Sequence, residues 1–206
     1  MTPDISSGEK HYIEGSWPPL RGDYIVSDPE GRVAVVTLAS VMRVGIAAII
    51  GTCKTENLGV EKIVANLISN SNIRFLLICG AESKGHLPGN TLIALYMNGL
   101  DEKGRIIGSK GAIPFIQNLT SEAVKRFQDQ IQLIDRIGLE DEEQIRLLVE
   151  EYSSKEEPYP EKPFQAVKHR SRKSLSVPCG CANIVGDVLF GSDVIMDSVA
   201  WKVMGG

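Results

Sequence analysis

Three short runs of almost continuously apolar residues constrain the fold of this chain more than any other feature. They cover residues 33–38, 44–50 and 73–79. A strand with one solvent-exposed face alternates apolar and polar residues, whereas a strand buried on both faces is apolar throughout. The runs therefore predict the central strands of a mostly parallel sheet that is covered by helices.

A helical pattern separates the second and third runs. Apolar residues recur at 60, 63, 64, 67 and 68, the spacing of one helix face, and predict a helix over 58–69. Strand, helix and strand together form a βαβ unit with a right-handed crossover. Further helices are expected over 91–98, 121–137 and 141–152, and short strands over 24–26, 105–108 and 112–116.

The chain changes character after residue 152. Residues 153–163 contain Pro158, Pro160 and Pro163, which is typical of a linker. We therefore expect an α/β, Rossmann-like domain over 1–152, in which helices flank a mostly parallel sheet. Residues 153–206 are expected to form a linker and a C-terminal extension, with short elements over 184–190 and 194–203.

Charge and composition exclude several classes of function. The formal net charge of −4 argues against a nucleic-acid-binding protein, which needs a positive field, and the basic stretch 168–173 is interpreted as solvated. No apolar run approaches the roughly 20 residues of a membrane span, and residues 1–10 lack a secretory pattern. With only 4 cysteines as well, the chain is expected to be cytoplasmic.

Two glycine-containing loops follow predicted strands and are the best places for a ligand. They are 51–57 and 80–89, and ligands of doubly wound sheets bind beyond the carboxyl ends of the strands. Gly80 and Gly85 have the spacing of a phosphate-binding loop, but His86 and Leu87 stand where its lysine and hydroxyl residue would be. Nucleotide binding is therefore a weaker hypothesis.

His86 is the most informative residue of the second loop. It is a candidate ligand or catalytic group, although from the residues alone a surface histidine that caps a helix or binds a carbonyl is the simpler explanation. Glu56 or Glu82 could lie near it and orient the ring, as carboxylates do behind metal-bound histidines. Cys179 and Cys181 form a single CxC pair, for which two thiols in a glycine turn are the simpler explanation.

Several segments together resemble one known family, the A subunit of tetrahydromethanopterin S-methyltransferase of methanogenic archaea. The likeness covers about residues 12–152. The segments that carry it are WPP (17–19), GDY (22–24), KTENLGVEK (54–62), NIRFLLICG (72–80), KGH (84–86), GRIIG (104–108) and GAIPFI (111–116).

The resemblance implies a corrinoid cofactor, of the cobalamin or 5-hydroxybenzimidazolylcobamide type, with His86 as the cobalt ligand in place of the corrinoid's own base. It implies a methyl carrier between methyl-tetrahydromethanopterin and coenzyme M, which act through partner subunits, and no catalytic residue is assigned. Loop position predicts further corrinoid-binding residues, namely Gly51, Thr52, Asn57, Gly85, Leu87, Gly89 and Pro114.

The chain departs from related patterns in two respects. Corrinoid proteins with a DxHxxG motif place an acid two residues before the histidine, whereas Lys84 stands here, so another partner must fix the ring. The membrane-bound members of the family end in a hydrophobic anchor that this chain lacks, although association with a membrane complex stays open. The alternative hypothesis is a non-enzymatic paralogue that binds corrinoid, or that regulates or scaffolds a methyltransferase.

Overall fold

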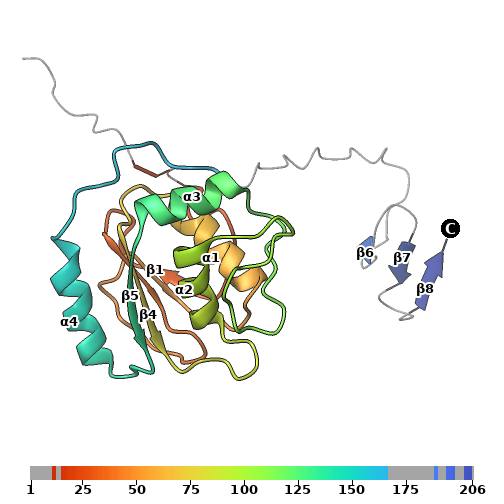
Figure 1. Cartoon of the computed structure of the whole chain (residues 1–206), viewed down its shortest axis with the longest axis horizontal. Coiled ribbons are helices and arrows are strands. Elements are labelled where there is room, and N and C mark those ends of the chain that lie inside the picture. The colour runs from red at the N-terminus through yellow and green to blue at the C-terminus, as the bar shows by residue number, and fades with distance from the viewer. Residues whose placement is uncertain (1–10, 13–14, 167–187, 190–193, 198–201, 206) are drawn as a thin grey trace, which may run out of the picture. The chain divides into compact units, whose positions relative to one another are not determined.

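The computed structural model describes residues 11–12, 15–166, 188–189, 194–197 and 202–205 (Figure 1). The chain divides into two compact units between Lys168 and His169. The described part of the first unit contains β1 (Tyr24–Val26), β2 (Val33–Val36), β3 (Ile49–Gly51), α1 (Leu58–Ile68), β4 (Phe75–Gly80), α2 (Pro88–Asn98), α3 (Ser121–Gln130), β5 (Gln132–Ile137) and α4 (Glu142–Ser153).

One five-stranded sheet organises the first unit. Its strand order is β1-β3-β2-β4-β5, in which β2 to β5 run parallel and β1 pairs antiparallel with β3 at one edge. In the centre of the sheet, Val35 is paired with Ile50 on one side and Leu77 on the other. The predicted α/β fold with a mostly parallel sheet is confirmed.

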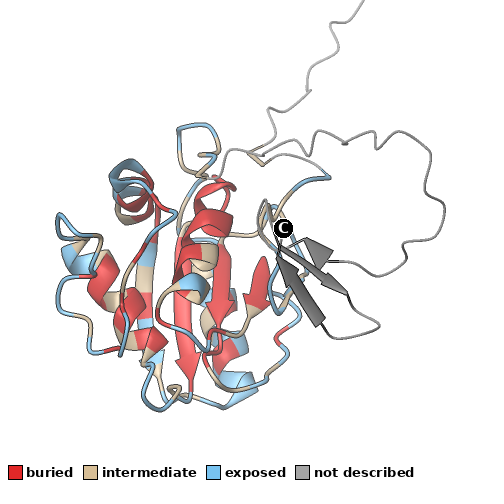
Figure 2. Ribbon diagram, turned by 90° about the vertical axis from the view of Figure 1, so that its right-hand side faces the viewer, coloured by how far each residue is buried: buried red, intermediate tan, exposed pale blue. Residues whose placement is uncertain are grey.

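Helices cover both faces of the sheet, which is why the strand sequences are apolar throughout (Figure 2). Leu76 and Ile78 of β4 pack in the cluster that contains residues of α1, α2 and α3. Phe75, Leu77 and Cys79 point to the opposite face and pack with α4. Successive residues of one strand thus serve two separate cores.

The expected helix over 121–137 is wrong in its second half. Helix α3 ends at Gln130, and Ile131 has an extended backbone with φ −101° and ψ 136°. The Gln130 side chain donates hydrogen bonds to the carbonyls of Leu67, Asn70 and Ile73, and β5 then pairs in parallel with β4. The spacing of Ile131, Ile134 and Ile137 fits a helix locally, but the pairing of this segment with β4 at the sheet edge makes it a strand.

Other expected strands are shorter than the sequence suggests or absent. Of the run 44–50 only Ile49 and Ile50 lie in β3, while Val44 and Ala47 fill the core from a turn. The expected strands 105–108 and 112–116 are reduced to isolated bridges, one of which joins Arg105 to Phe115. Val44 and Ala47 are thus apolar because they are buried, whereas Ile46, Ile107 and Ile113 of these runs are exposed.

Residues 154–166 belong to the first unit and are hydrogen-bonded to the rest of it. Arg126 of α3 is buried, donates from Nη1 to Glu161 Oε2 at 2.5 Å and lies 4.2 Å from the centre of the Tyr159 ring. The backbone N–H of Tyr159 donates to the carbonyl of Ser71. The contacts therefore divide the chain after residue 168, whereas a functional boundary at 152 stays a prediction.

The described part of the second unit is a three-stranded antiparallel sheet, β6-β7-β8. Its strands are Val188–Leu189, Val194–Asp197 and Lys202–Gly205. The basic stretch 168–173 and the pair Cys179 and Cys181 lie outside the described residues. Within the described part of the whole chain, no helix has the length and hydropathy that a membrane crossing requires.

Removing a buried side chain of α4 should destabilise the protein strongly. Ile145 is 0% exposed and faces Phe75 and Leu77, so Ile145→Ala should lower the free energy of unfolding by about 2–5 kcal/mol. Leu147→Ala is the matched control, because that leucine of the same helix is 53% exposed. Urea denaturation measures both variants, and equal losses would contradict the assigned face of α4.

Candidate functional site

His86 lies in the loop that joins β4 to α2, at the carboxyl end of the sheet. The N–H groups of His86 and Leu87 both donate to the carbonyl of Ser83, which closes a tight turn. Gly85 and Leu87 have φ values of +83° and +49°, so two left-handed residues flank the histidine. The turn presents the imidazole outward, with 52% of the side chain exposed.

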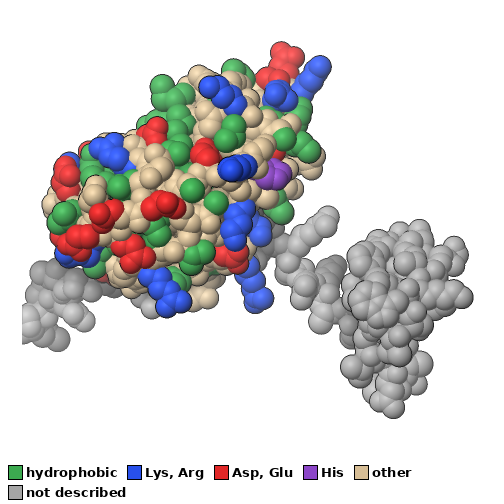
Figure 3. All heavy atoms as spheres, turned by 90° about the horizontal axis from the view of Figure 1, so that it is seen from below, with side chains coloured by type: hydrophobic (Ala, Val, Ile, Leu, Met, Phe, Trp, Pro, Cys, Tyr) green, Lys and Arg blue, Asp and Glu red, His purple; other side chains and the backbone are tan. Residues whose placement is uncertain are grey.

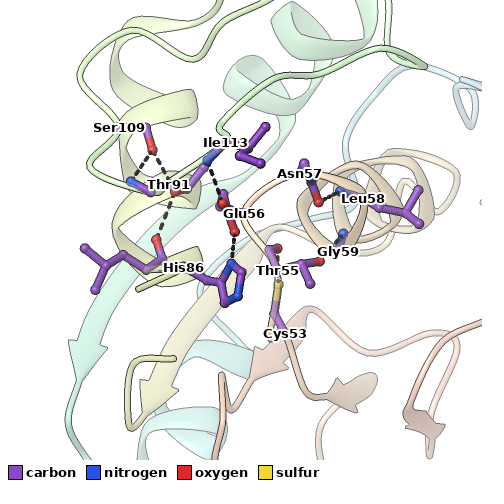
Figure 4. Close-up of polar contacts among 12 residues, drawn as sticks. Cys53, Thr55, Glu56, Asn57, Leu58, Gly59, His86, Thr91, Ser109 and Ile113 are labelled. Carbon is purple, nitrogen blue, oxygen red and sulfur yellow. Dashed lines mark hydrogen bonds and ion pairs between the residues drawn. The ribbon is translucent and has the colours of Figure 1, made fainter. Parts of the chain in front are cut away.

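The imidazole is held from behind by Glu56, which lies in the loop between β3 and α1 (Figure 4). His86 Nδ1 and Glu56 Oε2 are 2.8 Å apart, and only 2% of the glutamate side chain is exposed. The other carboxylate oxygen, Oε1, accepts the N–H of Ile113 at 2.7 Å. One buried carboxylate therefore connects the loop of His86 to the segment 108–115.

Segment 108–115 packs directly on this pair. A Cβ atom at Gly111 would lie 2.6 Å from the His86 carbonyl oxygen and 2.8 Å from Glu56 Cγ, so no larger residue fits there. Ser109 fixes the segment, because its hydroxyl lies 2.7 Å from that of Thr91 and accepts the N–H of Gly111. The buried side of the His86–Glu56 pair is thus shielded by backbone.

Hydrogen bonds keep Glu56 ionised despite its burial. Burial raises the pKa of this carboxyl, but hydrogen bonds from the N–H groups of Glu56 and Ile113, and the bond and charge of His86, outweigh it. The net result is a pKa below the usual value of 4.5. The carboxylate therefore accepts a hydrogen bond from Nδ1–H, which leaves the lone pair of the imidazole on Nε2.

Such a ring is arranged to form one bond to a metal. Metal-bound histidines commonly donate their second N–H to a carboxylate, which fixes the tautomer and makes the ring a stronger ligand. A single nitrogen suits a metal whose other positions are occupied by a chelator. No group of three or more His, Cys, Asp or Glu that could hold a metal ion occurs among the described residues.

The structure separates the two carboxylates that the sequence placed near His86. Glu56 makes the expected contact, whereas Glu82 accepts the N–H groups of Gly89 and Asn90 and caps the start of α2. The helix has no side-chain cap from Leu87 itself. Glu82 is therefore a structural partner of α2, and Glu56 is the carboxylate that orients the imidazole.

The other predicted site residues lie in different surroundings. Gly51 is the last residue of β3 and Thr52 follows it, where the N–H of Thr52 donates to the Asp23 carbonyl. Asn57 is occupied as the N-cap of α1, where Oδ1 accepts the N–H of Leu58 at 2.6 Å. Their roles in cofactor binding stay predictions.

Gly89 and Pro114 lie closer to the histidine loop. Gly89 is buried, and a Cβ there would meet side-chain atoms of Glu82, Leu38 and Ile137 at 2.9 Å. Pro114 follows the residue that binds Glu56, and its carbonyl accepts the N–H of Ile106. Gly89 thus allows close packing of α2 against the sheet.

Sequence reasoning missed Gly111 and Ile113. Ile113 contributes a backbone N–H, which any residue except proline provides, so its identity carries no signal. Gly111 is visible only as one of several glycines near a turn. Figure 3 looks onto this end of the sheet and shows a histidine at the surface, with basic and hydrophobic side chains around it.

Comparison with known proteins identifies the family of this chain. Residues 10–167 match the family described as the A subunit of tetrahydromethanopterin S-methyltransferase. The chain belongs to this family. It is 54% identical over 146 residues to the second tetrahydromethanopterin S-methyltransferase A subunit of Methanobrevibacter ruminantium, and the match covers 68% of this chain and 76% of that protein.

A second group of relatives matches more of the chain. It is 55% identical over 190 residues to the A subunit of a "Putative methyltransferase Mtx" of Methanosarcina acetivorans, and the match covers 91% of this chain and 94% of that protein. A Methanosarcina barkeri protein of the same name is 53% identical over 193 residues, 93% of this chain and 95% of its own length. Similarity to these proteins therefore extends into the second unit.

The charge of Glu56 should make stability depend on pH. Because its folded-state pKa lies below the unfolded value near 4.5, ionised Glu56 stabilises the fold above that pH, and this contribution is lost as the pH falls through the folded-state pKa. The free energy of unfolding of the wild type should therefore exceed that of Glu56→Gln at neutral pH, and the difference should shrink in acid.

Urea denaturation of the cofactor-free protein over a pH series measures this difference. Glu102→Gln, at an exposed position of another loop, is the control and should leave stability unchanged. A gap between wild type and Glu56→Gln that stays constant from neutral to acidic pH would contradict the prediction.

Proposed function

We propose that this chain is the corrinoid-binding, methyl-carrying component of a methyltransferase. Membership of the family supports methyl transfer, and the pairing of His86 with Glu56 is the observation that carries the corrinoid assignment. When bound, the corrinoid supplies a cobalt atom that can accept a methyl group and release it to a thiol. The protein supplies placement and the axial ligand.

The residues at the site fit such a cofactor. His86 Nε2 is the ring nitrogen that does not contact Glu56, and an imidazole nitrogen is a suitable ligand for the cobalt that a corrinoid would supply. A Cβ built on Gly85 meets nothing within 4 Å, so the space beside the histidine is open. An open surface next to an exposed nitrogen is what a flat macrocycle requires.

Each residue of the pair has a separate task in this proposal. His86 would hold the cobalt through Nε2, and Glu56 would keep the proton on Nδ1 and orient the ring. Gly111 and Ile113 close off the buried side of Glu56.

Partner subunits complete the reaction in this proposal. The methyl group would come from methyl-tetrahydromethanopterin and pass to coenzyme M, by analogy with the name of the family. The extended similarity to the Mtx proteins favours a separate partner set, because it includes the second unit. The alternative function is a corrinoid-binding protein that regulates or scaffolds a methyltransferase without carrying methyl groups.

Substitution of His86 should remove the axial ligand without unfolding the protein. The absorption spectrum of cobalamin bound to His86→Ala should change to that of a water-ligated form, and added imidazole should restore the wild-type spectrum. His11→Ala is the matched control, because His11 contacts Ser71 through its backbone carbonyl. An unchanged spectrum in His86→Ala would remove this residue from the role.

Substitution of Glu56 should weaken cobalamin binding without removing the histidine. Glu56→Gln should retain histidine ligation but bind cobalamin about 10–100-fold more weakly, since loss of a carboxylate behind a ligating histidine typically costs this much. Equal affinities for wild type and Glu56→Gln would show that the carboxylate does not tune the ligand.

Methyl turnover separates carrier from scaffold. The cobalamin-loaded chain, supplied with methyl donor, thiol acceptor and partner subunits, should transfer methyl groups in the wild type and fail to do so in His86→Ala. Cobalamin binding without transfer under the same conditions would favour the regulatory or scaffolding alternative.

A further inference from the structure

The connection between α2 and α3 is positioned by side chains of other elements. Residues 99–120, all of which the structure describes, contain no helix or strand, and they pair with one another through isolated bridges such as Arg105 with Phe115. The N–H of Ile113, which binds Glu56, belongs to this connection. Contacts that fix the connection therefore also fix one partner of the Glu56 carboxylate.

Glu61 of α1 makes the strongest of these contacts away from the histidine. Its Oε1 accepts the N–H groups of Gln117 and Asn118, and its Oε2 accepts the side-chain amide of Asn118 at 2.7 Å. Glu61 is only 5% exposed. Burial of a carboxylate is costly without hydrogen bonds, so these three donors hold the side chain and the connection in one arrangement.

Two carboxylates thus bind the two ends of residues 113–118. Glu56 directly precedes the N-cap of α1 and binds one end, and Glu61 in the first turn of that helix binds the other. Between these ends the N–H of Ile116 donates to the carbonyl of Gly104, and a Cβ at Gly104 would lie 2.7 Å from the Ile116 oxygen. The stretch is therefore held from both sides.

We propose that Glu61 is a positioning residue for the His86 ring. It acts through residues 113–118, which direct the Ile113 N–H at Glu56. Glu56 in turn keeps the proton on Nδ1 of the imidazole (Figure 4). The effect of Glu61 on cobalt binding rests on the proposed function, whereas its effect on the imidazole does not.

Nitrogen NMR of the cofactor-free full chain tests the effect on the ring, at mildly alkaline pH where an imidazole is neutral. The wild type should carry the ring proton on Nδ1 of His86. Glu61→Leu, which removes the acceptors, should give averaged resonances of two tautomers. Glu61→Gln keeps an acceptor oxygen for both backbone N–H groups and should resemble the wild type. The exposed Glu122→Gln is the control.

Exchange of donor and acceptor keeps the test decisive if Glu61→Leu does not fold. Asn118→Asp places a second carboxylate against Glu61, and the repulsion should mix the tautomers of His86. The double variant Glu61→Gln/Asn118→Asp restores an amide–carboxylate pair with the roles reversed. It should recover the wild-type resonances.

Cobalamin affinity tests the same path by non-additivity. Glu61→Leu should weaken binding about tenfold in the wild type, which lies within the coupling found between residues of one hydrogen-bond network. In Glu56→Gln, where the path to His86 is already broken, the same substitution should weaken binding less than about threefold.

The outcomes separate this inference from the proposed function. Unchanged His86 resonances in Glu61→Leu and Asn118→Asp, or equal losses of affinity in both backgrounds, would show that Glu61 only supports the fold and would overturn the inference. If the wild type binds no cobalamin, the proposed function fails, and the His86 resonances alone decide the role of Glu61.

Discussion

The site of this protein depends on a single buried carboxylate. Glu56 accepts hydrogen bonds from the His86 ring on one oxygen and from the Ile113 backbone on the other. The low exposure of the carboxylate would make an unpaired charge costly, so its two partners are needed to hold it in place. Three segments that are distant in sequence are therefore positioned relative to one another by one side chain.

The parallel sheet makes this arrangement available. Strands β3 and β4 end at the same edge, so the loops that follow them, 52–57 and 81–87, meet there even though β2 lies between the strands. The same topology places a cavity of about 270 Å³, which Cys53 and Thr55 help to line, next to Glu56 in the loop after β3.

Much of this arrangement could be predicted from the sequence because burial on both faces of a strand leaves a clear pattern. The same logic failed at 121–137, where isoleucines at 131, 134 and 137 fit a helix as well as an edge strand, and only pairing with β4 decides. The sequence predicted that the loops 51–57 and 80–89 meet and that a carboxylate orients the His86 ring. It did not show whether Glu56 or Glu82 is that carboxylate. Ile113 acts through its backbone, and a backbone donor has no sequence signature.

Gly111 has a consequence for any attempt to transplant this chemistry. The absence of a side chain there lets the main chain approach the histidine carbonyl, so the histidine, its orienting carboxylate and the covering glycine come from positions 86, 56 and 111. No contiguous peptide contains them. An engineered copy of this histidine site would have to reproduce the mutual spacing of three loops, and a short grafted motif around the histidine would lack the parts that orient it.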